Sequence, residues 1–338
     1  MAGECCALVL SGSVAKGAFQ AGVLEEIAKA RMPIARIVAA SAGAMNAVGF
    51  AAGIRYGCPN AAAEVVTDTW LHDATWLRFL RPSLSGLVRG GVSSSRALAD
   101  VIADGIERIA PIASLPAPAA DVVVQMVVAP LLGTSSLNAA PDAVAGDTTY
   151  EHIAQFAGPS FDSEEGRRRL VTAVTASAAF PLLFSPVELE GVGPCVDGGA
   201  VNNAPVSYAL ESPEVTRVIV VTDSPRHHDH EDVPRGLEII GRLAEMLINE
   251  RLFRDVARSR VANRKLARID ELATRWGLSD AQRLELFDTI GWRPIELVQI
   301  RPDQPLEGTA FSGLHDRDLR ERYIEAGRVA AARTLDAL

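Results

Sequence analysis

Residues 6–24 of the 338-residue chain read CALVLSGSVAKGAFQAGVL. The first five residues form a continuous apolar run, which is typical of a β-strand buried on both faces. A turn of small residues follows at 11–13, and Phe19, Val23 and Ile27 then recur at helical spacing. This stretch therefore predicts a strand, a turn and a helix in direct succession.

A second strand, turn and helix follow almost at once. Residues 37–45 read IVAASAGAM, in which a short apolar run leads into the small residues Ser41, Ala42 and Gly43. Strands that alternate with helices in this way are typical of a parallel sheet sandwiched by helices. We predict further strands at 122–128, 150–156, 217–221 and 296–300. The sequence therefore predicts an α/β fold with a mostly parallel central sheet flanked by helices.

The remaining segments suggest how the chain is organised. Residues 236–290, between the last two predicted strands, and residues 60–110 have mostly helical periodicity. Residues 134–149 are rich in Ser, Ala, Gly and Asp, have no periodicity, and are predicted to be a loop. The sequence contains no visible repeat and no convincing linker. We therefore expect residues 1–338 to form one domain with a helical insertion at 236–290.

The composition limits the classes of function. Hydrophobic residues make up 48% of the chain, which excludes a disordered protein. There are 42 Asp and Glu against 33 Lys and Arg, and the net charge of −9 argues against nucleic acid as a partner. The four cysteines (Cys5, Cys6, Cys58 and Cys195) include no CxxC pair, which argues against a disulfide scaffold and favours a reducing compartment.

The sequence also indicates neither a secretory signal nor a membrane span. Residues 1–4 lack the basic region that opens a secretory signal. Residues 37–54 and 170–187 approach the length of a membrane span, but Gly, Ser and Asn interrupt the first and Pro interrupts the second. We interpret both as buried elements. We expect a cytoplasmic protein, and leave open a peripheral contact with a membrane.

Three short segments carry candidate chemistry. The turn at 10–18 (LSGSVAKGA) offers backbone N–H groups beside a helix N-terminus, which suit a negative charge. Residues 39–43 (AASAG) match a nucleophile elbow, in which a sharp turn between strand and helix presents the Ser41 hydroxyl. Residues 194–205 (PCVDGGAVNNAP) place Asp197 in a glycine turn. Taken alone, each also fits an ordinary βα loop, helix cap or Asp-Gly turn.

In this order along the chain, the three segments resemble the patatin-like phospholipase family. The family pattern G-G-G-x-[KR]-G, G-x-S-x-G and D-G-[GA] corresponds to 12–17, 39–43 and 197–199, and AFQAGVL (18–24) and ASAAFP (176–181) support it. The resemblance implies a three-layer α/β sandwich and a Ser41–Asp197 dyad without a histidine. Ser41 would attack an ester carbonyl, and Asp197 would act as general base and then as general acid.

The resemblance also implies the rest of the site. Backbone N–H groups of Gly12, Ser13 and Val14 would hold the oxyanion, and Lys16 would help to fix their loop. The implied substrate is a phospholipid or another lipid ester, cleaved without a metal or an organic cofactor. Ser13 and Val14 replace the second and third loop glycines of the family, and Ala39 replaces the first glycine of the elbow. Because a β-branched residue at positive φ is unusual, the alternative is a catalytically weak or inactive lipid- or partner-binding protein on the same fold.

Two other patterns have competing interpretations. His227, His228 and His230 lie in a run of Pro, Asp and Glu that is typical of an exposed loop, and we expect no metal site there. Arginines recur at three- and four-residue spacing within the helical segment, at Arg251, Arg254, Arg258, Arg260, Arg264 and Arg268. This row fits a solvated helix face, which we favour, or a basic face for anionic lipid headgroups.

Overall fold

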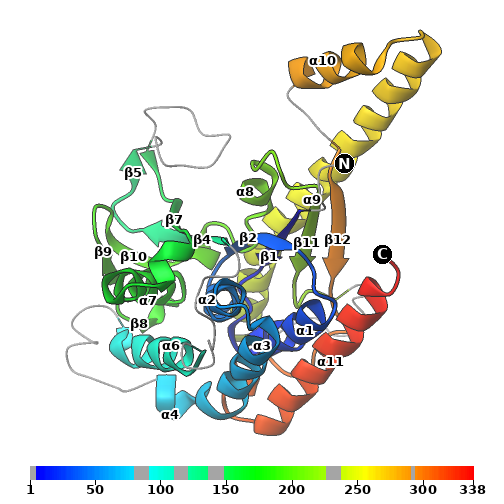
Figure 1. Cartoon of the computed structure of the whole chain (residues 1–338). Helices are drawn as coiled ribbons and strands as arrows, with labels where there is room; N and C mark the ends of the chain where they lie inside the picture. The colour runs from blue at the N-terminus through cyan, green and yellow to red at the C-terminus, as the bar shows by residue number, and fades with distance from the viewer. Residues whose placement is uncertain (1–4, 80–90, 110–120, 136–147, 226–236, 291–293) are drawn as a thin grey trace.

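The computed structural model describes residues 5–79, 91–109, 121–135, 148–225, 237–290 and 294–338. Within these ranges eight strands form one central sheet in the order β12-β11-β1-β2-β4-β10-β9, and β7 also pairs with β4 (Figure 1). The strands are β1 (Cys6–Leu10), β2 (Ile34–Ala39), β4 (Val123–Pro130), β7 (His152–Phe156), β9 (Val187–Leu189), β10 (Gly193–Asp197), β11 (Arg217–Val221) and β12 (Glu296–Ile300). From β12 to β4 neighbouring strands run parallel, whereas β7 and β10 run antiparallel to β4. The predicted α/β fold with a mostly parallel sheet is confirmed.

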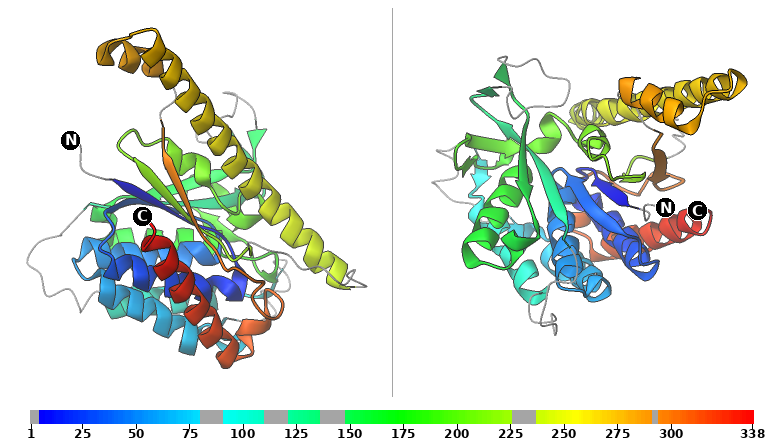
Figure 2. Two further views of the ribbon diagram at one scale, coloured as in Figure 1. Left: turned by 90° about the vertical axis from the view of Figure 1, so that its right-hand side faces the viewer. Right: turned by 45° about the horizontal axis from the view of Figure 1, so that its top comes forward.

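Helices cover both faces of this sheet (Figures 1 and 2). One face carries α1 (Gly17–Lys29), α2 (Ala42–Arg55), α3 (Pro59–Asp68), α6 (Arg96–Ile109), α7 (Glu164–Ser177) and α11 (Arg317–Leu335). The other face carries α8 (Val206–Leu210) and α9 (Leu237–Arg275). The result is a three-layer arrangement of helices, sheet and helices.

The side chains of β1 alternate between two hydrophobic cores. Cys6, Leu8 and Leu10 belong to the core that also contains residues of α1, α2 and α7, whereas Ala7 and Val9 belong to the core shared with α8 and α9. Successive side chains of a strand point to opposite faces of the sheet. Because both faces are covered, all five side chains are fully buried. This burial is the physical reason for the continuous apolar run that opens the sequence.

Three segments differ from the sequence-based prediction in detail. The strand expected at 150–156 begins only at His152, which pairs with Val128 on the edge of β4 opposite to β2 and β10. The mostly helical region 60–110 also contains β3 (Gly91–Ser93), which pairs with β8 (Leu182–Phe184). The predicted loop has a paired ribbon at its ends, β5 (Thr134–Ser135) and β6 (Thr148–Thr149), while 136–147 lie outside the described residues. Such short strands leave no periodic signal in the sequence.

The segment expected to be a helical insertion holds α9 and α10 (Asp280–Ile290). Figure 2 shows α9 running past the edge of the sheet, with α10 beside its far end. Val256 and Leu266 of α9 are buried, whereas its described arginines, from Arg254 to Arg268, are exposed. Exposure is what both interpretations of the arginine row require, and the division into one domain with an insertion stays a prediction. None of the described helices has an apolar stretch long enough to cross a membrane.

Candidate active site

The strand register brings two of the three predicted segments to one level of the sheet. In β4, Met126 pairs with Ala39 of β2, and Val128, two residues further on, pairs with Asp197 of β10. Ser41 follows Ala39 by two residues, so it continues β2 to the level of Val128. The first segment follows β1, the parallel neighbour of β2, and therefore lies at the same edge of the sheet.

Ser41 and Asp197 are in direct contact. The Ser41 hydroxyl donates a hydrogen bond to Asp197 Oδ2 over 2.6 Å, and the Gly199 N–H donates to Asp197 Oδ1 over 2.7 Å. Both side chains are buried. Burial raises the pKa of Asp197 to about 7, although the hydrogen bonds from Ser41 and Gly199 act to lower it. A carboxyl with a pKa near neutrality can both accept and return a proton.

The turn at Ser41 has the geometry of a nucleophile elbow. Ser41 has φ 54° and ψ −128°, a left-handed conformation that is costly for any residue with a side chain. Two contacts hold it there: the Ser41 N–H donates to Ser177 Oγ over 3.0 Å, and the Ala40 N–H donates to the Leu10 carbonyl over 3.2 Å. Gly43 must be a glycine, because an added Cβ would lie 2.3 Å from that same carbonyl oxygen.

The loop expected to bind an oxyanion is tied to the segment after Asp197. The Gly12 N–H donates to the Asn203 carbonyl over 3.0 Å, and Asn203 Nδ2 donates back to the Gly12 carbonyl over 2.8 Å. The Gly12 N–H is therefore engaged and is not available as the oxyanion donor that the sequence predicted. The N–H groups of Ser13 and Val14 have no acceptor among the described residues. Val14 has φ 49°, so this β-branched residue holds the left-handed conformation that glycine adopts without strain.

A series of hydrogen-bonded, buried polar side chains holds this loop in place. Gln20 Nε2 donates to Ser13 Oγ over 3.2 Å, Asn46 Nδ2 donates to Gln20 Oε1 over 3.0 Å, and Trp70 Nε1 donates to Asn46 Oδ1 over 2.6 Å. Lys16, which we expected to fix the loop, makes no side-chain hydrogen bond or ion pair within the described part of the chain. The support comes instead from neutral amides.

A hydrophobic pocket lies beside the dyad. It is lined by Ser41, Asp197 and Val14, and by six aromatic residues in the described ranges: Trp70, Trp76, Phe79, Phe180, Phe184 and Phe311. The whole chain is only 5% aromatic, so this clustering is unlike its average composition. The rings also pack on one another, since Trp76 stacks on Phe311 at 6.1 Å and the edge of Phe180 meets Phe311 at 5.6 Å. Such a lining suits an apolar group attached to a reacting centre at Ser41.

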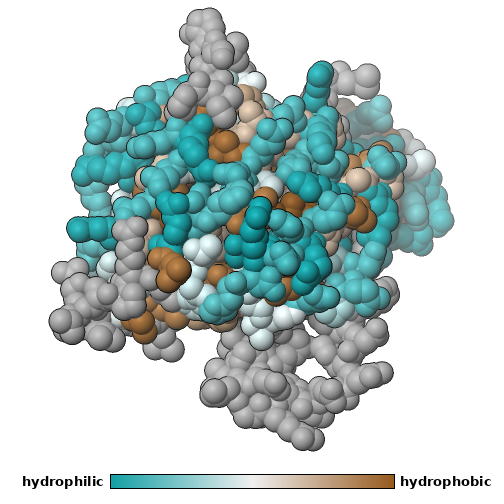
Figure 3. All heavy atoms as spheres, turned by 90° about the horizontal axis from the view of Figure 1, so that it is seen from below, coloured by the Kyte–Doolittle hydropathy of each residue, from teal (hydrophilic) through white to brown (hydrophobic). Residues whose placement is uncertain are grey.

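The surface near the pocket is mixed. Trp76 belongs to α4 (Trp76–Phe79), where the neighbouring Leu77 is 88% exposed. Figure 3 views the molecule from the side of this helix and shows separate hydrophobic patches between hydrophilic residues. The coloured surface in this view is therefore not one continuous apolar face.

The sequence alone did not indicate a role for several residues of this site. Ser177 and Phe180 lie in ASAAFP, and Asn203 lies in the Asp197 segment, so both stretches were recognised without a role for these side chains. Trp76 and Phe311 left no signal at all, because they are scattered over distant parts of the chain and only the fold brings them together.

The described residues include no group of three or more His, Cys, Asp or Glu side chains placed to hold a metal ion. His227, His228 and His230 lie outside the described residues, so their expected role as an exposed loop stays a prediction. None of the four cysteines forms a disulfide, and burial raises the pKa of Cys195 to about 11 and also raises that of Cys58. Neither thiol is therefore activated as a nucleophile.

The geometry can be compared with known proteins. A sequence model of the patatin-like phospholipase family matches residues 8–210, which include Ser41, Asp197 and most of the pocket. The chain belongs to this family. Patatin-like phospholipases are acyl hydrolases that act on lipid esters. Phe311 and Leu314 also line the pocket but lie beyond the matched residues, so the C-terminal part of this patatin-like chain completes the wall.

Solved structures agree on the fold. VipD from Legionella pneumophila aligns over 100% of this chain and 67% of its own, with a TM-score of 0.50 and 13% sequence identity. At this identity the likeness concerns the patatin-like fold alone. No curated protein sequence matches the chain.

Proposed function

We propose that this protein is a lipid acyl hydrolase in which Ser41 is the nucleophile and Asp197 the general base. The observation that carries the proposal is the 2.6 Å hydrogen bond from Ser41 Oγ to a buried carboxyl with a pKa of about 7. Membership of an acyl hydrolase family supports the reaction class. The histidines play no part in this proposal, because no histidine contacts either side chain among the described residues.

The two side chains divide the chemistry between them. Ionised Asp197 takes the hydroxyl proton of Ser41 as Oγ attacks the ester carbonyl carbon. Protonated Asp197 then gives this proton to the oxygen of the leaving alcohol, and the acyl group stays on Ser41. In the second half, Asp197 takes a proton from water, whose oxygen attacks the acyl-enzyme, and returns that proton to Ser41 as the carboxylic acid leaves.

Backbone N–H groups around Ser41 would stabilise the oxyanion. Ser13 and Val14 offer two N–H groups without an acceptor in the described structure, and Ala42, the first residue of α2, offers a third. The positive end of the α2 dipole also lies directly behind Ser41. Removing one donor of this kind typically lowers kcat by roughly 100- to 1000-fold. The proposed oxyanion site therefore differs from the expected one because the Ala42 N–H takes the place of the Gly12 N–H.

The substrate follows from the pocket. Its aromatic lining would receive the acyl chain, because apolar atoms gain about 25 cal/mol for each Å² removed from water. Lipid esters such as phospholipids present their acyl chains at an interface, so we include a peripheral contact with a membrane in the proposal. The exposed Leu77 next to the pocket residue Trp76 is the surface feature that supports it.

A fluorophosphonate probe tests the proposal directly. The wild-type protein should be labelled on Ser41 and should hydrolyse a p-nitrophenyl ester, whereas Ser41→Ala should lose both properties. Asp197→Asn should lose turnover. Ser279→Ala removes an exposed hydroxyl that caps α10 and serves as the control that keeps labelling and turnover.

The alternative is a lipid-binding protein without turnover, and the side chain of Val14 in the pocket is the observation that favours it. Absence of labelling in a correctly folded wild-type protein that still binds fatty acid would establish this alternative. Labelling at Ser41 would exclude it.

A further inference from the structure

A second apolar cavity lies behind the pocket that contains Ser41. It is enclosed by α2, α3, α6 and the π-helix η2 (Thr69–Asp73), and its wall includes Gly49, Val66, Ile102 and Ile106. Two residues, Met45 and Trp70, line both cavities. These two side chains therefore form the partition between the pocket of the dyad and the space behind it.

The volumes of the two cavities give a limit for the acyl chain. The cavity beside Ser41 has a volume of about 50 Å³ and the one behind it about 30 Å³. Both volumes are small, and the larger belongs to the cavity beside Ser41. The pocket as it stands suits a short acyl chain.

Trp70 is the rigid half of the partition. Its Nε1 donates to Asn46 Oδ1 over 2.6 Å in a buried position, and its ring packs on Gly17, where an added Cβ would lie 2.5 Å from the indole. The side chain is 3% exposed. A buried hydrogen bond and close packing on backbone leave the indole no room to turn aside.

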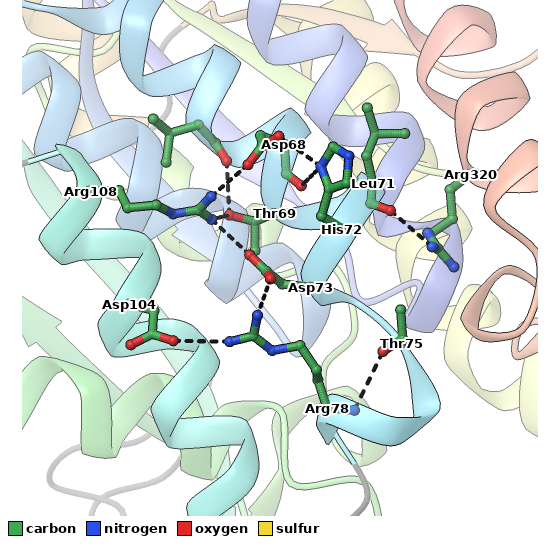
Figure 4. A network of polar contacts seen from close by, with 11 residues as sticks. Asp68, Thr69, Leu71, His72, Asp73, Thr75, Arg78, Asp104, Arg108 and Arg320 are labelled. Carbon is green, nitrogen blue, oxygen red and sulfur yellow. Dashed lines mark hydrogen bonds and ion pairs between the residues drawn. The ribbon is translucent and has the colours of Figure 1, made fainter.

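The π-helix that carries Trp70 is itself held by ion pairs. Figure 4 shows Arg108 reaching Asp73 over 3.0 Å, while Arg78 contacts Asp73 from the other side and also pairs with Asp104. Arg320 of α11 donates to the Leu71 carbonyl over 3.0 Å. These contacts anchor η2 to α6 and α11, so the backbone beneath Trp70 is fixed from two sides.

Met45 is the adaptable half. It lies one helical turn after Ser41 on the same face of α2, in line with Gly49 one further turn along. The two turns from Ser41 to Gly49 span about 12 Å, so this face leads from the reacting centre into the second cavity. Methionine has an unbranched chain that fills irregular space and makes no hydrogen bond that would hold it. Shortening Met45 would therefore join the two cavities.

We propose that Met45, backed by Trp70, sets the maximum acyl length of the substrate by separating the pocket beside Ser41 from the cavity behind it. This inference rests on the proposed function, because the acyl chain enters the pocket only when its carbonyl lies at Ser41. The cavity between α2, α3 and α6 is the extension that Met45 closes. Met45 acts on specificity and takes no part in the transfer of protons.

A series of p-nitrophenyl esters from acetate to palmitate tests this proposal. The wild-type protein should have its highest kcat/KM between butanoate and hexanoate. Met45→Ala should raise the ratio of kcat/KM for decanoate over butanoate by at least about tenfold, because each methylene that becomes buried adds a several-fold preference. Met32→Ala makes the same deletion in a partly buried methionine remote from both cavities and should leave the ratio unchanged.

A second variant tests whether the rear cavity accounts for the change in chain preference. Ile106→Phe fills the rear cavity, so the double variant Met45→Ala/Ile106→Phe should return to the wild-type chain preference. Binding is an independent readout: in the Ser41→Ala background, decanoate should bind at least about tenfold more tightly when Met45 is also Ala.

The outcomes separate the two proposals. Hydrolysis of esters with a chain preference that Met45→Ala does not change, or a wild-type optimum at palmitate, would overturn the role of Met45. No hydrolysis of any ester by folded wild-type protein would instead refute the proposed function. In that case the binding of decanoate still tests the role of Met45, since unchanged binding in the Met45→Ala variant would refute it.

Discussion

Replacing Asp197 with Asn should abolish turnover and at the same time stabilise the protein in a pH-dependent way. Asp197 is 3% exposed, and burial raises its pKa from 3.8 to about 7. In the unfolded chain this carboxyl ionises near its ordinary pKa. Between these two values the unfolded state has therefore lost a proton that the folded state still holds, so rising pH favours unfolding.

The size of the effect follows from the two pKa values. Each pH unit in this window lowers the free energy of unfolding of the wild type by about 1.4 kcal/mol. The total loss is about 4 kcal/mol, and it stops growing above pH 7, where both states are ionised. Asn cannot ionise and avoids this loss, while its Oδ1 can still accept from Gly199 and its amide can donate to Ser41.

Urea denaturation from acidic to alkaline pH, followed by circular dichroism, measures the difference. The two proteins should differ little near the ordinary pKa of Asp, and Asp197→Asn should be more stable by up to about 4 kcal/mol above pH 7. Asp336→Asn changes an exposed carboxyl at the end of α11 and should follow the wild type throughout. A difference that stays constant with pH, or a variant that is less stable at alkaline pH, would refute the raised pKa of Asp197.

Other variants probe the remaining parts of the site. The wild-type kcat/KM should rise with pH and level off above about 7, because only ionised Asp197 accepts the Ser41 proton, and a flat profile would argue against this base. Ser177→Ala leaves the buried Ser41 N–H without its acceptor, so urea denaturation should show a loss of about 1–3 kcal/mol and kcat should fall more than KM changes. Val14→Gly removes a β-branched residue from a left-handed conformation. The relief of about 1–2 kcal/mol of backbone strain should outweigh the cost of about 0.5–1 kcal/mol from the greater entropy of the unfolded chain, so the melting temperature should rise. The value of kcat should also rise, because the Val14 side chain no longer occupies the pocket. An unchanged melting temperature and kcat would show that the loop is unstrained.

The arrangement of the first two strand–helix units could be predicted because their signals are local. Cys6 to Leu10 are apolar without interruption since both faces of β1 are covered. Gly43 is required where it meets the backbone of Leu10, and Gly12 where an added Cβ would collide with the side chain of Asn203. The same small residues carry the resemblance to the patatin-like phospholipases. Ser41 and Asp197 were therefore predicted as a pair from the sequence. The structure joins them by a hydrogen bond, and their catalytic roles stay a proposal.

The antiparallel part of the sheet could not be placed in this way. β7 pairs with one edge of β4, whereas β10 pairs with the other edge, beyond the point where β2 ends. The ribbons β3–β8 and β5–β6 consist of two or three residues per strand. The choice of an edge and such short pairings leave no pattern in a single segment.

The sequence by itself indicated the succession of strand, turn and helix at the start of the chain and the sharp turn at Ser41, and its motifs of small residues led to the pairing of Ser41 with Asp197, because each depends on neighbours in the chain. Only the tertiary structure decided which N–H groups remain free, since Asn203 reaches back to Gly12 from a distant segment. It also decided the pKa of Asp197, which comes from burial, and the pocket, whose wall joins Met45 to aromatic residues as far away as Phe311. Desolvation and cavity shape depend on many residues that only folding brings together, so no local sequence pattern predicts them.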